Sequence, residues 1–131
     1  MKLRIKGNSL RLRVSPSEMA RLMQVGRIEG TIRFAIEDDA KLTYALEHSA
    51  AQAEMSVRYR LQEVTVTLST EDAHRWLEGK QVGLHREYAI GGELLVVLVE
   101  KDFACLDGSD ADNADAFVNP KHGTDCPRSQ I

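Results

Sequence analysis

Alternating polar and apolar positions dominate the first part of the chain and predict two β-hairpins. Basic and apolar residues alternate over residues 2–6 and again over residues 10–14, with Gly7, Asn8 and Ser9 as a turn between them. A period of two is typical of a strand with one buried face. Residues 27–36 and 42–46 alternate in the same way around an acidic turn. The pattern therefore predicts a second hairpin.

Between these hairpins the apolar spacing becomes helical. Ser15 is followed by Pro16 and, three positions on, by Glu18, and Met19 and Leu22 then recur at helical spacing. A serine at the N-cap, a proline at the first helical position and an acid at the third are the usual signals of a helix start. A helix of two to three turns ending near Gly26 is therefore expected.

The same order of elements recurs in the second half of the chain. Strand-like alternation over residues 55–68 leads to a second cap at Ser69 and a helix carrying Trp76, and two further strands follow. An offset of 54 residues places residues 3–46 on 57–100 without a gap. The sequence thus predicts a pseudo-twofold α+β domain over residues 1–106. We expect duplicated strand-strand-helix-strand-strand units, with about eight antiparallel strands in an open or closed barrel-like sheet and two helices.

The most apolar strand ends in a group of charged residues. Residues 94–99 are continuously apolar, which predicts a strand buried on both faces, and Glu100, Lys101 and Asp102 follow directly. We call the stretch from Glu100 to Cys105 the rim, and it is the first candidate site. Continued alternation turns Glu100 and Asp102 to one face, and Lys101, Phe103 and Cys105 to the other. Two close carboxylates repel, so either a metal or a basic partner is expected, and the N-terminal arginines are favoured.

Basic residues of the strands form the second candidate site. They lie opposite the apolar positions, and those singled out as ligand-binding candidates are Arg4, Arg11, Arg13, Arg58 and Arg60. If neighbouring hairpins adjoin, these side chains form one basic plate. Guanidinium groups bind phosphate and carboxylate in a bidentate manner. Inside a barrel the plate would be a strong anion site. On the outside of a barrel its side chains would be solvated strand residues that discourage edge pairing, and this outside position is favoured.

Beyond residue 106 no periodicity remains. Residues 107–115 are rich in aspartate, and the chain to residue 131 has neither helical nor strand spacing, which predicts an acidic loop and an irregular tail. Cys105, His122 and Cys126 are donor types that zinc prefers, but close cysteine pairs are missing from their spacing. They stay weak metal-ligand candidates, and no cofactor is implied.

Composition limits the broad class of protein. The 131 residues are 43% hydrophobic and 28% charged, and the net charge of −3 argues against a general nucleic-acid binder. No apolar segment approaches the roughly 20 residues of a membrane span, and no basic and apolar leader opens the chain. A cytoplasmic protein is expected, with its two cysteines as free thiols or metal ligands instead of a disulfide. Residues 1–27 carry seven basic side chains and one acid, whereas residues 100–131 carry seven acids and three bases.

Three segments carry a resemblance to a family of short, uncharacterised bacterial proteins. These are the opening Met-Lys-Leu-Arg-Ile-Lys-Gly-Asn-Ser-Leu-Arg-Leu-Arg, the Val-Glu-Lys-Asp-Phe-Ala-Cys-Leu block at 99–106 and Asp-Ala-Phe-Val-Asn-Pro at 115–120. The resemblance spans nearly the whole chain and implies no activity. Val118 departs from the proline expected before Asn119, which loosens the turn predicted there.

The duplicated layout also resembles the triphosphate-tunnel enzymes at the level of the fold. Their barrels bind polyphosphate with lysines and arginines and hold a metal with glutamates. Their opening strand carries alternating glutamates, whereas residues 2–6 here read Lys-Leu-Arg-Ile-Lys, so the metal-binding half of that signature is missing. The resemblance implies a fold and no activity.

Two hypotheses about function follow. The first is a small soluble binding or interaction module, with a protein or a small anion as partner, that works through the rim. The second is an enzyme or sensor for a phosphate-containing anion held by the basic strand face, with or without a metal ion. The histidines have no surroundings that suggest a nucleophilic triad. Convergence of the arginines in a cavity would favour the second hypothesis, and divergence into solvent would remove it.

Overall fold

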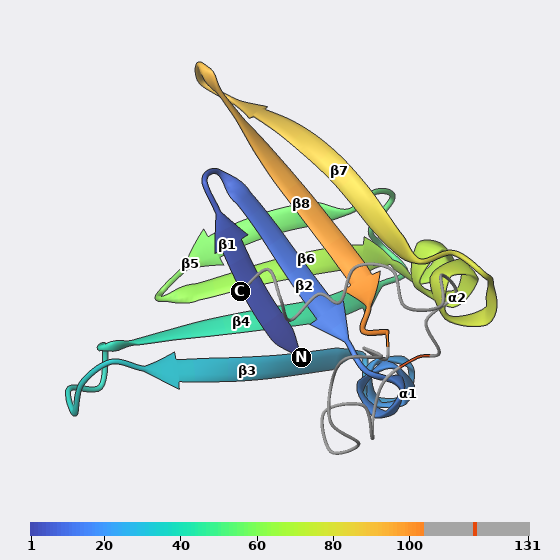
Figure 1. The fold of residues 1–131 in the computed structure, drawn as a ribbon, viewed down its shortest axis with the longest axis horizontal. Helices are drawn as coiled ribbons and strands as arrows, with labels where there is room; N and C mark the ends of the chain where they lie inside the picture. The colour runs from blue at the N-terminus through green and yellow to red at the C-terminus, as the bar shows by residue number, and fades with distance from the viewer. Residues whose placement is uncertain (104–116, 118–131) are drawn as a thin grey trace.

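The computed structural model describes residues 1–103 and residue 117, and these form a two-layer α+β fold (Figure 1). The elements are β1 (Lys2–Lys6), β2 (Ser9–Val14), α1 (Pro16–Val25), β3 (Arg27–Arg33), β4 (Lys41–Ser49), β5 (Ser56–Arg60), β6 (Glu63–Ser69), α2 (Thr70–Glu78), β7 (Gly83–Ile90) and β8 (Glu93–Lys101). The predicted α+β class, the eight strands and the two helices are confirmed. Apart from residue 117, the expected loop and tail at 107–131 lie outside the described residues.

The strands form two sheets of four. Sheet A has the order β1-β2-β8-β7, and sheet B has the order β3-β4-β6-β5. The four hairpins are antiparallel, but the central pairs β2–β8 and β4–β6 are parallel. The prediction of antiparallel strands throughout was therefore wrong for these two pairs. Each central pair joins hairpins from different halves of the chain, and strand spacing carries no information about the direction of such a partner.

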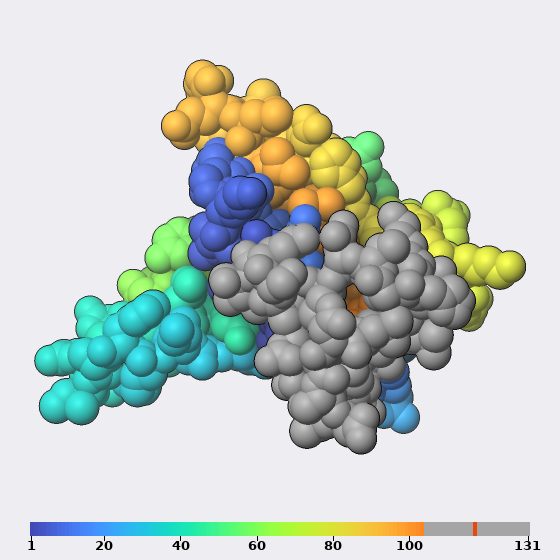
Figure 2. All heavy atoms as spheres, in the orientation of Figure 1, coloured from blue at the N-terminus to red at the C-terminus, as the bar shows by residue number. Residues whose placement is uncertain are grey.

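The barrel expected as one possibility is also absent from the described residues. Each sheet keeps two edge strands, β1 and β7 in sheet A and β3 and β5 in sheet B, and no pairing joins the sheets. All four hairpin turns lie away from the two helices (Figure 1). In the space-filling view the β3–β4 and β7–β8 hairpins project from the body in different directions (Figure 2). The described strands thus form two separate sheets whose β3–β4 and β7–β8 hairpins diverge.

Both predicted helix caps are present. Ser15 accepts a hydrogen bond from the Glu18 amide at 3.4 Å, and the Glu18 carboxylate accepts one from the Ser15 amide at 3.1 Å. At α2, Ser69 accepts from the Asp72 amide at 3.0 Å. Only α1 has the reciprocal bond from its third residue, and only α1 ends in a left-handed glycine, Gly26, with φ 89°. The N-terminus of α1 is therefore satisfied more completely than that of α2.

The core lies between the facing sides of the sheets and under both helices. It consists of Leu10, Leu12, Val14, Met19, Leu22, Ile28, Leu46, Met55, Val66, Leu68, Ala73, Trp76, Val97 and Val99. Leu22 of α1 and Trp76 of α2 are both fully buried in it, as their helical spacing predicts. The Trp76 indole also donates a hydrogen bond to the Val82 carbonyl at 3.2 Å. The apolar faces of the strands thus pack against each other between the sheets, and the polar faces point outward.

Candidate functional site on the outer face of sheet A

The outer face of sheet A carries a concentration of positive charge. Alternation on β1 and β2 places five cationic side chains there, which we call the basic face: Lys2, Arg4, Lys6, Arg11 and Arg13. The antiparallel register sets Lys2 opposite Arg13 and Arg4 opposite Arg11. Directly opposed like charges destabilise a strand pair. The basic face therefore favours a bound or neighbouring negative group.

A small hollow lies within the basic face. It is lined by Arg4, Lys6, Ser9, Arg11 and Leu98 and has a volume of about 130 Å³. The Ser9 hydroxyl donates a hydrogen bond to the Lys6 carbonyl at 2.6 Å, which holds the hairpin end beside the hollow. Three of the five lining residues are cationic. The hollow is therefore suited to an anion.

The rim carboxylates lie beside the basic face and pair with it. Because β8 runs parallel to β2, Glu100 lies opposite Arg13, and its Oε1 is 2.8 Å from Arg11 Nε. This oxygen is buried and makes the ion pair without hydrogen-bond geometry. Asp102 Oδ2 is 2.8 Å from Lys2 Nζ. The expected pairing of both acids with N-terminal cations is confirmed, although the partner of Asp102 is a lysine rather than an arginine.

The pKa of Arg13 reflects this crowding of charge. Burial and the neighbouring charge of Arg11 lower the pKa of the Arg13 guanidinium, while Glu100 and Asp102 act in the opposite direction. The lowering effects prevail, so the carboxylates of β8 do not fully offset the cations around Arg13. A further anion at this face would stabilise the charged guanidinium.

Lys101 is turned away from the ligand-facing side. It is buried on the opposite face of β8, donates a hydrogen bond from Nζ to the Gly79 carbonyl at 3.0 Å, and lies 5.4 Å from the centre of the Phe117 ring. Phe103 packs edge to face on Phe117 with a centroid distance of 6.0 Å. The predicted division of the rim into two faces therefore holds for residues 100–103. Lys101 supports the C-terminus of α2 instead of contributing to the site.

Arg58 and Arg60 lie on a different sheet from the other candidate arginines. They project from the outer face of β5, at the edge of sheet B, and line a separate hollow of about 340 Å³ with Leu61 and Glu63. The arginines therefore lie on outer faces of the sheets, as favoured. They do not form the single basic plate that was expected if neighbouring hairpins adjoined. The hairpins β1–β2 and β5–β6 do not adjoin, because each pairs with a hairpin from the other half of the chain.

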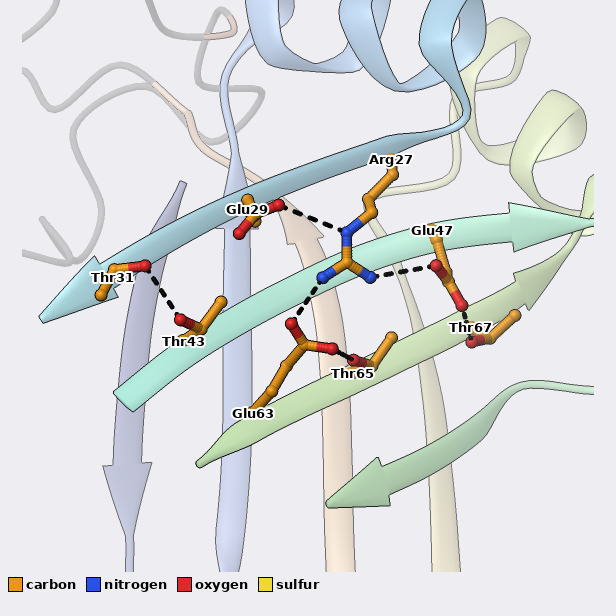
Figure 3. A network of polar contacts seen from close by, with 8 residues as sticks. All are labelled: Arg27, Glu29, Thr31, Thr43, Glu47, Glu63, Thr65 and Thr67. Carbon is orange, nitrogen blue, oxygen red and sulfur yellow. Dashed lines mark hydrogen bonds and ion pairs between the residues drawn. The ribbon is translucent and has the colours of Figure 1, made fainter. Parts of the chain in front are cut away.

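The centre of the outer face of sheet B holds a polar network that the sequence did not predict (Figure 3). Arg27 contacts Glu63 at 2.8 Å, Glu47 at 3.1 Å and Glu29 at 3.5 Å. Thr65 donates a hydrogen bond to Glu63, and Thr67 donates one to Glu47, both at 3.0 Å. Burial lowers the pKa of the Arg27 guanidinium. The hydrogen bond to Glu47 and the charge of Glu63 act in the opposite direction, and the pKa is raised overall. Only the pairing of three strands brings these groups together.

A second cluster missing from the sequence predictions joins β7 to the loop before β5. Arg86 contacts Glu54 at 2.7 Å, donates to the Met55 carbonyl at 2.8 Å and lies 4.9 Å from the centre of the Tyr88 ring. The Tyr88 hydroxyl donates to the same carbonyl. Burial raises the pKa of Tyr88. Strand alternation predicts that both side chains lie on one face. It does not predict that they bind the Met55 carbonyl, because no sequence pattern marks a loop carbonyl as a hydrogen-bond acceptor.

The proposed metal ligands Cys105, His122 and Cys126 lie outside the described residues. Within residues 1–103 and 117, no group of three histidine, cysteine or acidic side chains has an arrangement that could hold a metal ion. No helix in this part of the chain is long and apolar enough to cross a membrane.

These features define a two-sheet α+β domain with a basic outer face next to two paired carboxylates. Residues 1–121 match the model of DUF7009, a family of unknown function, and the chain belongs to this family. The resemblance to an uncharacterised family is thereby confirmed. Searches of curated proteins and of solved structures found no match.

Proposed function

We propose that this protein is a binding module that holds one anionic group, a phosphate or a carboxylate, in the hollow on the basic face. The observation that carries the proposal is the imbalance of charge around the hollow. Strands β1 and β2 supply five cations, whereas among the described residues the rim supplies two carboxylates, which pair with Lys2 and Arg11. Three cationic side chains and no described carboxylate line the hollow itself. The rim carboxylates hold Arg11 and Lys2 in place, so their role is to position the basic face.

The size of the hollow supports a single charged group as the ligand. Pockets for drug-sized molecules have volumes of about 300–1,000 Å³, whereas this hollow has about 130 Å³. A phosphate or carboxylate at the end of a larger molecule fits such a site. Arginine supplies paired donors for either group, and lysine supplies a point charge.

The chemistry of the lining favours binding over catalysis. Among the described residues, no imidazole, thiol or carboxylate lines the hollow, and its one hydroxyl, on Ser9, donates to the Lys6 carbonyl. A hydrolytic or transfer reaction needs a nucleophile with a base in reach. The candidate arginines also lie on two outer faces and not in one cavity, which removes the enzyme or sensor hypothesis. The small anion proposed here is a partner of the binding module.

We also infer that the two halves of the chain are duplicated units. Adding 54 to the β1–β2 pair Lys2 and Arg13 gives Ser56 and Thr67, which pair in β5–β6. The serine caps at 15 and 69 follow the same offset. Three lining positions of the two hollows also correspond: Arg4 with Arg58, Lys6 with Arg60 and Ser9 with Glu63. The second hairpins need other offsets, since Arg27 pairs with Glu47 but Gly83 with Glu100.

Isothermal titration calorimetry with inorganic phosphate and citrate, at low ionic strength, tests anion binding. We expect saturable binding that weakens as salt is added, because the face is exposed to solvent. Lys6→Gln should weaken it about tenfold, the loss of one charged hydrogen bond of about 1.5 kcal/mol. Lys6 is the suitable position because, among the described residues, its side chain makes no ion pair.

The matched control is Lys41→Gln, which removes an exposed lysine from the outer face of sheet B. Its affinity for both anions should equal that of the unaltered protein. Equal loss in the two variants, or no saturable binding by the unaltered protein, contradicts the proposed function.

A further inference from the structure

The outer edge of β5 is an unoccupied strand edge. Sheet B ends at β5, which pairs with β6 and, among the described residues, with no other strand. An edge strand presents a row of backbone donors and acceptors to which another extended chain can pair. The question is which residues of β5 face this edge and what chemistry surrounds them.

The hairpin turn determines which backbone groups are free. Leu61 and Gln62, with φ of 52° and 59°, form the two-residue turn, and Arg60 lies opposite Glu63. The residues that flank such a turn exchange hydrogen bonds with each other, and the pattern then alternates along the strand. Arg60 and Arg58 therefore direct their backbone groups toward β6. The N–H and C=O groups of Val57 and Tyr59 point to the open edge.

The side chains beside this edge are cationic on one face and apolar on the other. Arg58 and Arg60 are exposed on the outer face and make no ion pair or hydrogen bond within the described part of the chain. They lie about 7 Å apart, two strand residues. Glu63, which lies opposite Arg60, is held by Arg27 and Thr65. On the other face Tyr59 is 66% exposed.

We propose that β5 is the docking site for an extended acidic segment of a partner protein, which adds to sheet B as a fifth strand. In such a segment acidic and apolar residues alternate. Its backbone pairs with Val57 and Tyr59, its acidic side chains contact Arg58 and Arg60, and its apolar side chains pack on Tyr59. Main-chain bonds supply affinity in this mode of recognition, and the alternate side chains supply specificity.

Charge selects a foreign acidic segment over a second copy of this chain. Two copies of β5 paired antiparallel about a twofold axis would bring the arginines of one copy against those of the other. Like charges opposite each other in a strand pair are destabilising, and opposite charges are stabilising. A self-paired edge would therefore be weaker than one paired with an acidic strand.

Each of the other three edge strands has charged or polar side chains that are engaged within the described residues. Lys2 of β1 pairs with Asp102, and Arg27 of β3 belongs to the polar network. On β7, Arg86 and Tyr88 hold the Met55 carbonyl. On β5 both outward cations, Arg58 and Arg60, lack an ion pair among the described residues, whereas on β1 only Lys6 does. This inference is independent of the anion site, which lies on the other sheet.

A synthetic peptide with capped ends and alternating glutamate and valine serves as the probe, added to isotope-labelled protein. We expect amide chemical-shift changes over residues 57–61. The double variant Arg58→Glu with Arg60→Glu should bind this peptide about tenfold more weakly, and should gain binding to a peptide in which lysine replaces glutamate. The Tyr59→Pro variant should bind neither peptide, because proline removes a backbone N–H that points to the open edge while the hydrogen bonds to β6 remain.

The matched control is Lys41→Glu, which reverses a charge on the same outer face but near the opposite edge. It should bind the glutamate peptide as the unaltered protein does. The proposal is overturned if amides 57–61 do not respond to the peptide, or if charge reversal leaves the preference between the two peptides unchanged. Sedimentation that shows self-association through β5 would also overturn it in favour of a second copy.

Discussion

The outer faces of the two sheets have the same strand layout and opposite charge arrangements. On sheet A the second strand, β2, carries Arg11 and Arg13, and the acids lie at the end of β8. On sheet B the corresponding second strand, β6, carries Thr65 and Thr67, and three glutamates surround a central arginine. Sheet A therefore has cations in its middle, whereas on sheet B the arginines that make no ion pair or hydrogen bond among the described residues, Arg58 and Arg60, lie at the edge.

The first strand of a hairpin therefore does not by itself determine what the hairpin can bind. Arg4 with Lys6, and Arg58 with Arg60, occupy equivalent positions on equivalent hairpins. What differs is the second strand of each hairpin, which carries Arg11 and Arg13 on β2 but Glu63, Thr65 and Thr67 on β6. The first arrangement favours an anion held on the face, and the second leaves Arg58 and Arg60 without an ion pair among the described residues, beside an open backbone edge.

The largest expected effect concerns the central arginine of sheet B. Arg27→Met should lower the free energy of unfolding by about 2 kcal/mol, because it leaves the half-buried Glu47 and Glu63 close together without their cation. Chemical denaturation measures the loss. Lys41→Met, at an exposed position of the same face, should change stability by less than about 0.5 kcal/mol. Similar values for both variants would show that the network does not stabilise sheet B.

A smaller effect separates the two halves at their helix caps. Ser15→Ala and Ser69→Ala should each lower the free energy of unfolding by about 1 kcal/mol. The loss should be larger at Ser15, because its side chain also contacts the Glu18 carboxylate at 3.0 Å. Urea denaturation of both variants provides the test. No loss in either variant, or a larger loss at Ser69, would contradict the description of the caps.

Local sequence signals predicted the elements and their faces well. The serine caps, the hairpins and the inward positions of Leu22 and Trp76 depend on residues close together in the chain, so spacing alone identifies them. The ion pairs of Glu100 and Asp102 were predictable because strong charge at both ends of the chain was visible in the sequence. These features need no knowledge of which strands adjoin.

Features that depend on the pairing of distant strands were not predictable. A period of two assigns Arg58 to the polar face of a strand but does not say that β5 belongs to a different sheet from β1. The Arg27 network needs the registers of β3, β4 and β6 together. The turn at Leu61 and Gln62 also lacks the glycine that usually marks positive φ, so its geometry was not predictable from the residues that form it.

If the basic face holds a single anion and β5 pairs with an acidic strand, the β1–β2 and β5–β6 hairpins bind different ligands, and amide chemical shifts of the labelled protein separate the two sites. Inorganic phosphate is added first, to saturation, so that it occupies the anion site before the glutamate–valine peptide is added. We expect phosphate to shift the amides of residues 4–13 and not those of residues 57–61, and the peptide then to shift those of residues 57–61. Phosphate that shifts both hairpins equally, or a peptide that leaves residues 57–61 unshifted, would contradict this assignment of ligands to hairpins.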